Sequence, residues 1–445
     1  MKHRSHFTAN ALAPALLLLA LLLALPRAAR GQETDAPKFE IGVQYSSLSV
    51  NLPGFRGTEH VAGFGARATY NLNDYFAVEA EGNVFPSKAQ TDYVTGGASQ
   101  QAQFGVKAGK RWKTFGLFAK ARPGFVSFGE TVTPLLTESG GVVTVFDFAR
   151  ERKTHFSMDV GGVLEFYPSR RMLVRFDLGD TIIRYGEHAE LQPFGFIPGG
   201  PVVGTAPAQT THNFQFSGGV GFRFGGGDET GGGGGAAGTP APASERRFEV
   251  GVQFSSLALR LSPELLNFPF PGGGGQGSRA EAGLGARVGF NVTDNLAFEA
   301  EGNFYPRRRF GFDATTGGYP SQMQAGVKYG RRFERFGLFA KARPGFLNFS
   351  SVTTLTHVEV STFEGQQFVI PNFEQRRQTY FSMDVGGVLE FYPSRRILTR
   401  FDFGDTMVRY PERSLPGPFT GGLIRSIPSD VRHNFQFTGG IGLRF

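Results

Sequence analysis

The chain of 445 residues contains no cysteine and one tryptophan, and it has no long hydrophobic run after its first thirty residues. The lack of cysteine excludes a disulfide framework and a lipid-anchored cysteine. The lack of a later apolar run excludes helical membrane insertion, and the mean hydropathy is slightly negative at -0.18. A membrane barrel escapes these exclusions, because its strands alternate apolar and polar residues.

The N-terminus has the layout of a secretory signal peptide. Lys2 and Arg4 precede an apolar stretch at residues 11–25. This stretch is shorter than the roughly 20 residues that a spanning helix needs. We therefore expect residues 1–31 to be removed on export, and the alternative is an N-terminal membrane anchor.

Glycine and phenylalanine are abundant, with 63 and 47 residues, and this composition favours β-structure with crowded faces and an aromatic outer surface. The formal charge of +8 could indicate nucleic-acid binding. Exported proteins seldom meet nucleic acid, however, and the basic residues are spread among strands and turns. We expect no nucleic-acid partner, and we interpret the Lys and Arg residues as facing anionic lipid head groups.

The rest of the chain is an internal duplication. The sequence FSMDVGGVLEFYPSRR occupies residues 156–171 and returns at residues 381–396. Likewise HNFQFSGGVGFRF at 212–224 becomes HNFQFTGGIGLRF at 433–445. Such repetition indicates two copies of one structural unit.

The duplication predicts one domain at residues 38–224 and a second at residues 247–445. The Gly-rich segment between them, residues 225–246, is expected to be a flexible linker. By random-coil scaling it spans roughly 25 Å, whereas a merged barrel needs only a tight turn at this point.

Within each copy, side chains alternate with a period of two, which is typical of strands with one face in each environment. We expect eight strands in the first copy, near residues 39–48, 61–71, 76–85, 101–111, 115–128, 155–167, 172–185 and 211–224. Tight turns, such as Asn73-Asp74, alternate with long gaps at residues 49–60, 86–100, 129–154 and 186–210. The sequence therefore predicts an all-β fold of two tandem eight-stranded, antiparallel, up-and-down transmembrane β-barrels, and one sixteen-stranded barrel is the alternative.

The end of each copy carries a polar-x-Gly-x-x-apolar-x-aromatic pattern. Its residues are Thr438, Gly440, Leu443 and Phe445 at the end of the chain, and Ser217, Gly219, Phe222 and Phe224 in the first copy. The pattern resembles the signal by which the barrel-assembly machinery recognises outer-membrane proteins, so each copy resembles a small barrel of the OmpA-like or opacity family. The resemblance implies location in the outer membrane, the assembly machinery as a partner during biogenesis, and lipopolysaccharide and other outer-membrane lipids as neighbours.

Charged residues of the first copy fall on the glycine-bearing face of the strands. They are Glu79, Glu81, Lys107, Lys120, Arg122, Asp159, Glu165, Arg175, Asp177 and Arg223. This face could form a polar conduit, or it could fill a closed interior with neutralising ion pairs. The equal number of acids and bases favours the filled interior, because buried charges need partners.

Three patterns could carry chemistry. Glu79 and Glu81 could serve acid-base catalysis, although their spacing places both in one lumen. A second group, formed by Asp177, Asp180, Thr181, Arg184 and Tyr185, could hold a divalent cation that bridges lipopolysaccharide, although hydrogen bonding at the barrel rim is the favoured interpretation. His212 and Ser217 could resemble the pair used by lipid A hydrolases, but Thr438 replaces the serine in the second copy.

We therefore expect no catalytic residues, no cofactor and no metal. The leading hypothesis is a non-enzymatic structural and surface-interaction protein that displays long extracellular loops. A passive, porin-like channel is the alternative, and a lipid A-modifying enzyme is the third hypothesis. The loops carry no recognised motif, so their sequence does not identify an extracellular ligand.

Overall fold

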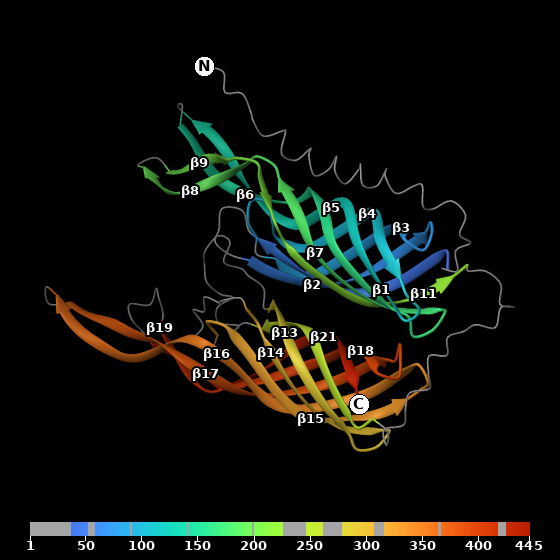
Figure 1. Ribbon diagram of the computed structural model, residues 1–445. Helices are drawn as coiled ribbons and strands as arrows, with labels where there is room; N and C mark the ends of the chain where they lie inside the picture. Colours follow the sequence, from blue (N-terminus) through green and yellow to red (C-terminus); the bar gives the residue numbers. More distant parts are fainter. Residues whose placement is uncertain are drawn as a thin grey trace.

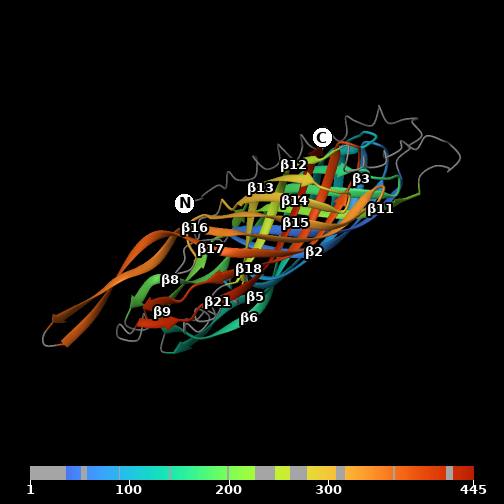
Figure 2. The ribbon, with the colours of Figure 1, turned by 90° about the horizontal axis from the view of Figure 1, so that it is seen from below.

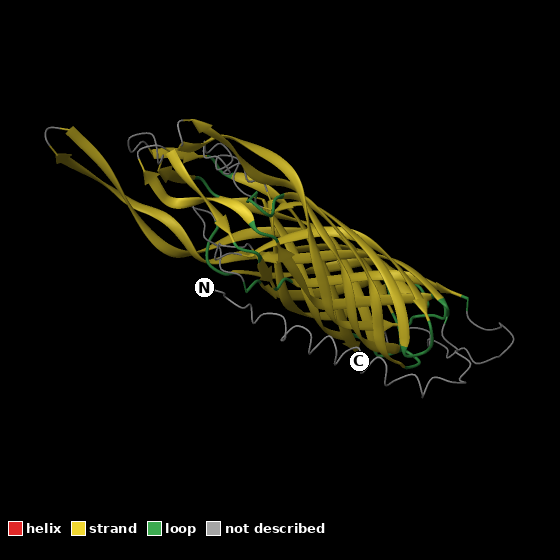
Figure 3. Cartoon of the chain, turned by 90° about the horizontal axis from the view of Figure 1, so that it is seen from above, coloured by secondary structure: helices red, strands yellow, loops and turns green. Residues whose placement is uncertain are grey.

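A computed structural model describes residues 37–51, 58–89, 91–139, 142–197, 200–225, 246–260, 278–306, 316–363, 366–416 and 424–445. These segments form strands joined by turns and loops (Figure 3). None of the described segments contains a helix long and apolar enough to span a membrane. The expected signal peptide, residues 1–31, and most of the expected linker, residues 226–245, lie outside the described residues.

The first copy closes into a ring of eight antiparallel strands. They are β1 (Phe39–Asn51), β2 (Thr58–Asn71), β3 (Phe76–Ala89), β4 (Gly97–Arg111), β5 (Phe115–Ser139), β6 (Val142–Phe166), β7 (Met172–Tyr185) and β11 (Phe214–Phe224). Each strand from β1 to β6 pairs with the one that follows it in the chain. Strand β11 pairs with β7 on one edge and with β1 on the other, which closes the ring.

The second copy repeats this ring. Its strands are β12 (Phe248–Arg260), β13 (Ser278–Asn291), β14 (Leu296–Phe304), β15 (Pro320–Arg332), β16 (Phe336–Phe363), β17 (Gln366–Phe391), β18 (Ile397–Tyr410) and β21 (Asp430–Arg444). Strand β21 pairs with both β18 and β12. Because both edges of β11 are occupied within the first copy, β11 has no edge left for β12. The two predicted eight-stranded barrels are confirmed, and they lie side by side (Figures 1 and 2).

The alternation of side chains decides which face of each strand becomes the lumen. In β1, Phe39, Ile41 and Val43 are exposed on the outer wall, whereas Glu40 and Gln44 are buried inside. Inward glycines let the neighbouring strand approach closely. At Gly105, for example, an added Cβ would lie 2.2 Å from the carbonyl oxygen of Ala121.

The expected gap between strands at residues 129–154 consists largely of strand, and so does the equivalent connection of the second copy. Strands β5 and β6 continue as a hairpin to the pair Ser139↔Val142, and β16 and β17 continue to Phe363↔Gln366. Alternating Val, Thr and Phe residues favour strand in these segments. The hairpins extend well beyond the barrel walls (Figures 1 and 3).

Shorter strands occupy the last connection of each copy. They are β8 (His188–Ile197), β9 (Gly200–Ala206) and β10 (Gln209–Thr211) in the first copy, and β19 (Arg413–Pro416) and β20 (Ile424–Ile427) in the second. Strands β8 and β9 form one hairpin, and β19 and β20 form another. Strand β10 instead extends the pairing of β7.

Aromatic side chains on the outer walls join the two barrels. Tyr45 stacks on Phe437 with ring centroids 3.9 Å apart, and Phe216 stacks on Phe254 at 4.0 Å. In the duplicated sequence Tyr45 corresponds to Phe254, and Phe216 corresponds to Phe437. An approximate twofold symmetry therefore relates the two stacked pairs.

Two further contacts lie on this symmetry axis, because each joins a residue to its own counterpart. Phe176 and Phe401 are counterparts with ring centroids 5.3 Å apart. His60 and Ala280 are also counterparts, and they form a backbone bridge between β2 and β13. The interface therefore has the self-complementary form of a twofold dimer, here within one chain.

Candidate functional site: the two filled lumens

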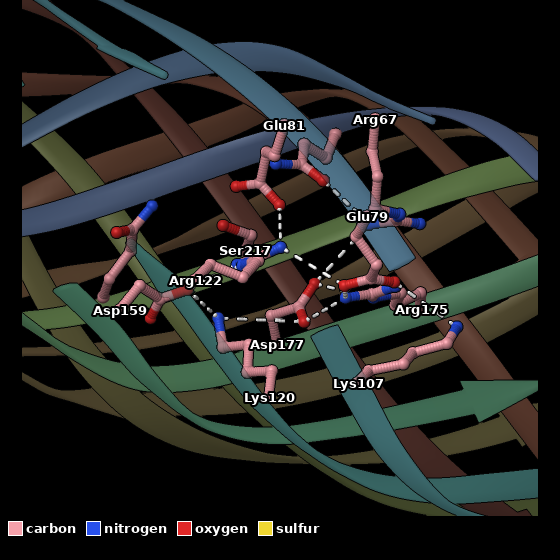
Figure 4. Close-up of polar contacts among 12 residues, drawn as sticks. Arg67, Glu79, Glu81, Lys107, Lys120, Arg122, Asp159, Arg175, Asp177 and Ser217 are labelled. Carbon is pink, nitrogen blue, oxygen red and sulfur yellow. Dashed lines mark hydrogen bonds and ion pairs between the residues drawn. The ribbon is translucent and has the colours of Figure 1, made fainter. Parts of the chain in front are cut away.

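Ten charged residues predicted from the sequence converge in the first lumen, where each is at most 8% exposed. Figure 4 labels all of them except Glu165 and Arg223. The Arg175 guanidinium donates to Glu79 and, at 2.8 Å, to Asp177. The Arg122 Nε donates to Asp159 Oδ2 at 3.0 Å, and its Nη1 donates to Glu81. Both arginines thus hold two carboxylates each.

Lysines link these arginine centres to the rest of the network. The Lys107 ammonium lies against Glu165 and is 3.4 Å from Glu79. The Lys120 ammonium lies 2.8 Å from Asp159 and 3.8 Å from Asp177. Nearer the end of the barrel that carries the tight turns, Arg223 Nε lies 3.5 Å from Glu40.

Three members of the network were missed by the sequence analysis: Glu40, Arg67 and Arg111. Arg67 lies 3.5 Å from Asp177, and Arg111 lies 3.4 Å from Glu40. Strand alternation could have identified the first two. Glu40 stands between the outward Phe39 and Ile41, and Arg67 has the same parity as the inward glycines of β2.

The second lumen repeats the arrangement. Three of its carboxylates, from Glu249, Glu299 and Glu390, lie within 4.8 Å of one another. Such a group could hold a metal ion, but the Lys328 ammonium lies among the three. It is 3.4 Å from Glu249, 3.0 Å from Glu299, and in close contact with Glu390. Lys328 therefore supplies the cation that these carboxylates require.

Next along the lumen, toward the long loops, lies a belt of side-chain amides. Asn83 accepts from Gln44 at 3.0 Å and donates to Gln101 at 2.8 Å. Gln215 bonds Gln101 at 3.0 Å and donates to Ser46 at 2.9 Å. The second barrel forms the same belt with Gln253, Asn303, Gln322, Gln436 and Ser255.

Beyond the amide belt, each lumen is closed by an apolar cluster. In the first barrel it comprises Leu48, Val50, Val61, Phe85, Ala89, Val94, Val126, Phe128, Ile183 and Tyr185. The second barrel has an equivalent cluster that includes Leu257, Tyr305 and Phe349. Charged, amide and apolar layers thus follow one another along each lumen, and β1 shows the order in Glu40, Gln44 and Leu48.

The predicted rim group is divided between the two faces of β7. Asp177, Thr181 and Tyr185 are buried inside, whereas Asp180 and Arg184 lie on the outer wall. Asp180 Oδ2 lies 2.6 Å from His212 Nδ1. Hydrogen bonding therefore accounts for Asp180, and the five residues do not form one ligand set.

The candidate hydrolase pair is also divided. His212 is exposed on the outer wall, whereas Ser217 is buried in the lumen and donates to Ser46 at 3.0 Å. His212 precedes β11, and its side chain lies outside the barrel wall, whereas Ser217 on β11 points into the lumen. This arrangement does not provide a histidine base for the Ser217 hydroxyl.

The residues of the expected assembly signal alternate between the two faces in the same way. Ser217, Gly219, Thr438 and Gly440 face the lumen, whereas Phe222, Phe224, Leu443 and Phe445 are exposed on the outer wall. The recognition of these residues during assembly stays a prediction. The geometry places their apolar members together near the end of the closing strand of each barrel.

Comparison with known proteins agrees with this architecture. Residues 15–235 match the outer membrane protein beta-barrel domain family, and the second copy repeats the sequence of the first. No curated protein matches the chain.

Several solved structures also match the chain, at low sequence identity. The N-terminal β-barrel domain of Pseudomonas aeruginosa OprF has 10% identity and a TM-score of 0.23, covering 45% of this chain and 99% of that one. Ail from Yersinia pestis has 13% identity and a TM-score of 0.26, covering 42% and 99%. A FadL homologue from Pseudomonas aeruginosa has 12% identity and a TM-score of 0.26, covering 94% of each chain.

Proposed function

We propose that this chain, whose residues 15–235 match the outer membrane protein beta-barrel domain family, is a non-enzymatic structural and surface-interaction protein of the outer membrane. The observation that carries the proposal is the filling of both lumens. Buried ion pairs, an amide belt and an apolar cluster occupy each barrel in succession. A passive channel would require a continuous water-filled pathway through these layers.

Barrel size supports the same conclusion. A ring of eight strands is just wide enough for side chains to fill its interior. The merged, wider barrel that a porin-like function requires is incompatible with the strand pairing, because β11 closes on β1 and β21 closes on β12. Small-solute diffusion is therefore not favoured by either lumen.

The outer ends of the barrels supply the surface for interaction. The hairpins β5–β6 and β16–β17 carry exposed polar residues beyond the barrel walls, among them Arg150, Glu359 and Arg376. Paired hairpins on a membrane-embedded barrel can present such side chains away from the lipid surface. Lipopolysaccharide and other outer-membrane lipids would surround the walls, and the barrel-assembly machinery would act during biogenesis.

Planar-bilayer recordings test the proposal. The purified full-length protein should give no stable, porin-sized conductance steps, whereas a general porin reconstituted in the same bilayers should give them. Stable steps from the wild-type chain would overturn the non-conducting role. For the enzyme hypothesis, lipid A from a deletion strain should have the same mass spectrum as lipid A from the parent strain.

A further inference from the structure

A cavity of about 420 Å³ opens on the outer wall of the second barrel, at the end of β17 and β18 near the long loops. It is lined by Gln378, Thr379, Tyr380, Phe381, Arg409, Pro411, Glu412 and Ser429. None of the ion pairs that fill the lumens contributes to this lining. The cavity is therefore separate from the lumen charge network, and it lies where β17 and β18 meet the connecting residues Pro411, Glu412 and Ser429.

The position of the cavity follows from the alternation of β17 and β18. Tyr380 and Val408 are buried inside the barrel, so their neighbours Phe381 and Arg409 point to the outer wall. Phe381 is 52% exposed and packs edge-on against Phe346 at 6.4 Å. These rings belong to the outward aromatic surface, and outer-membrane barrels place such rings at the membrane interface.

Polar groups lie next to this aromatic pair, on the side of the long loops. Thr379 lies two residues beyond Phe381 on the same face, and its hydroxyl accepts from Asn348 at 2.7 Å. Ser429 and Glu412 also line the cavity. The cavity is thus lined by an aromatic ring at one end and by polar side chains at the other.

Among the residues that line the cavity, Arg409 offers a positive charge to a ligand. Its side chain is exposed, and it has no ion-pair partner within the part of the chain that the structure describes. Neighbouring Arg413 and Arg432 lie 3.0 and 2.7 Å from Asp430. The Glu412 carboxylate accepts from the Ser426 hydroxyl at 2.7 Å, and exposed Arg377 adds a second positive charge farther out on β17.

We propose that this cavity binds the phosphorylated sugar headgroup of an outer-leaflet glycolipid. The planar guanidinium of Arg409 suits a phosphate group, which it can bind through two parallel hydrogen bonds. Thr379, Ser429 and Glu412 offer partners for sugar hydroxyls. Phe381 and Phe346 provide the apolar wall along which the acyl chains descend. The proposal depends on the outer-membrane location and is independent of whether the lumens conduct.

The first barrel offers a matched comparison. Arg184, Phe156 and Thr154 are the counterparts of Arg409, Phe381 and Thr379, and they have the same exposed orientation. Two other positions of the lining differ, because Gly186 and Ala208 stand where the second copy has Pro411 and Ser429. We therefore expect the first copy to bind the headgroup more weakly.

The test uses the full-length protein in a detergent that lacks phosphate, titrated with bisphosphorylated lipid A and followed by native mass spectrometry. Arg409→Gln should weaken binding about tenfold or more, which corresponds to about 1.4 kcal/mol for each factor of ten. Arg409→Lys should retain most of the affinity, because an ammonium also binds phosphate. Arg184→Gln should change affinity less than about twofold. Heat-modifiable gel mobility verifies that each variant is folded.

Further probes identify the chemistry that is recognised. Dephosphorylated lipid A should bind weakly to the wild type, with the affinity that intact lipid A has for Arg409→Gln. Millimolar inorganic phosphate should not displace lipid A from the wild type. Wild-type affinity in Arg409→Gln, or an equal loss in Arg184→Gln, would overturn the proposed site. Full displacement by inorganic phosphate would show a free-anion site and would overturn the glycolipid assignment.

Discussion

The Tyr45 hydroxyl donates a hydrogen bond of 2.6 Å to Ser256 Oγ, across the interface between the two barrels. The symmetric position lacks this bond, because Phe254 replaces tyrosine and Ser47, the counterpart of Ser256, has a buried hydroxyl without a hydrogen-bond partner among the described residues. One polar contact thus breaks an otherwise symmetric aromatic interface.

Restoring the missing hydroxyl should stabilise the pair of barrels. Phe254→Tyr places a donor opposite Ser47, and a typical intramolecular hydrogen bond contributes about 0.5–1.5 kcal/mol. We expect a higher unfolding midpoint in denaturant titrations of the detergent-solubilised protein. Phe248→Tyr is the control, because Phe248 is exposed on the outer wall. A gain of equal size in both variants would contradict the predicted bond.

Close approach of the barrels should depend on the outward glycines at the interface. A Cβ added to Gly218 would lie 3.1 Å from the Phe401 ring, so Gly218→Leu should separate the barrels. Because the chain has no cysteine, a His60→Cys/Ala280→Cys pair reports their contact without background. These residues bridge two antiparallel strands, where the Cα separation suits a disulfide.

We expect efficient oxidation of this cysteine pair in the otherwise unchanged chain and a large reduction when Gly218→Leu is added. Val84→Leu adds bulk on the exposed outer wall and should leave the yield unchanged. Undiminished cross-linking in the Gly218→Leu background would contradict the role of this glycine.

Buried charges in the lumen should be sensitive to the loss of one partner. Arg122→Ala leaves Glu81 and Asp159 without their shared guanidinium and should lower the free energy of unfolding by about 3–5 kcal/mol. Arg150→Ala is the control, since this side chain is 72% exposed and lies 3.9 Å from Glu130. Its effect should remain below about 1 kcal/mol. Equal, small effects of both variants in denaturant titrations would indicate a hydrated lumen.

Much of this architecture was predictable because strand alternation assigns each side chain to the lumen or the wall. It placed Glu79 and Arg175 in one interior, although 96 residues separate them. Alternation alone could not identify the contacts between barrels. By its pattern Phe216 is an outward residue, yet it is only 3% exposed because Phe254 covers it. Nor could it reveal the outer-wall cavity, which requires distant residues such as Phe381 and Ser429 to meet in the folded chain.

The central structural claim is that each copy closes its own barrel, and folding of residues 32–224 alone tests it most directly. The ring formed by β1 to β7 and β11 leaves no strand edge that needs the second copy. Interface residues such as Tyr45 and Phe216 would face lipid in the fragment, and lipid is as apolar as the partner surface. The fragment should therefore refold into a monomer with heat-modifiable gel mobility and β-sheet circular dichroism. Failure to fold without residues 247–445, under conditions in which the full chain folds, would contradict the account.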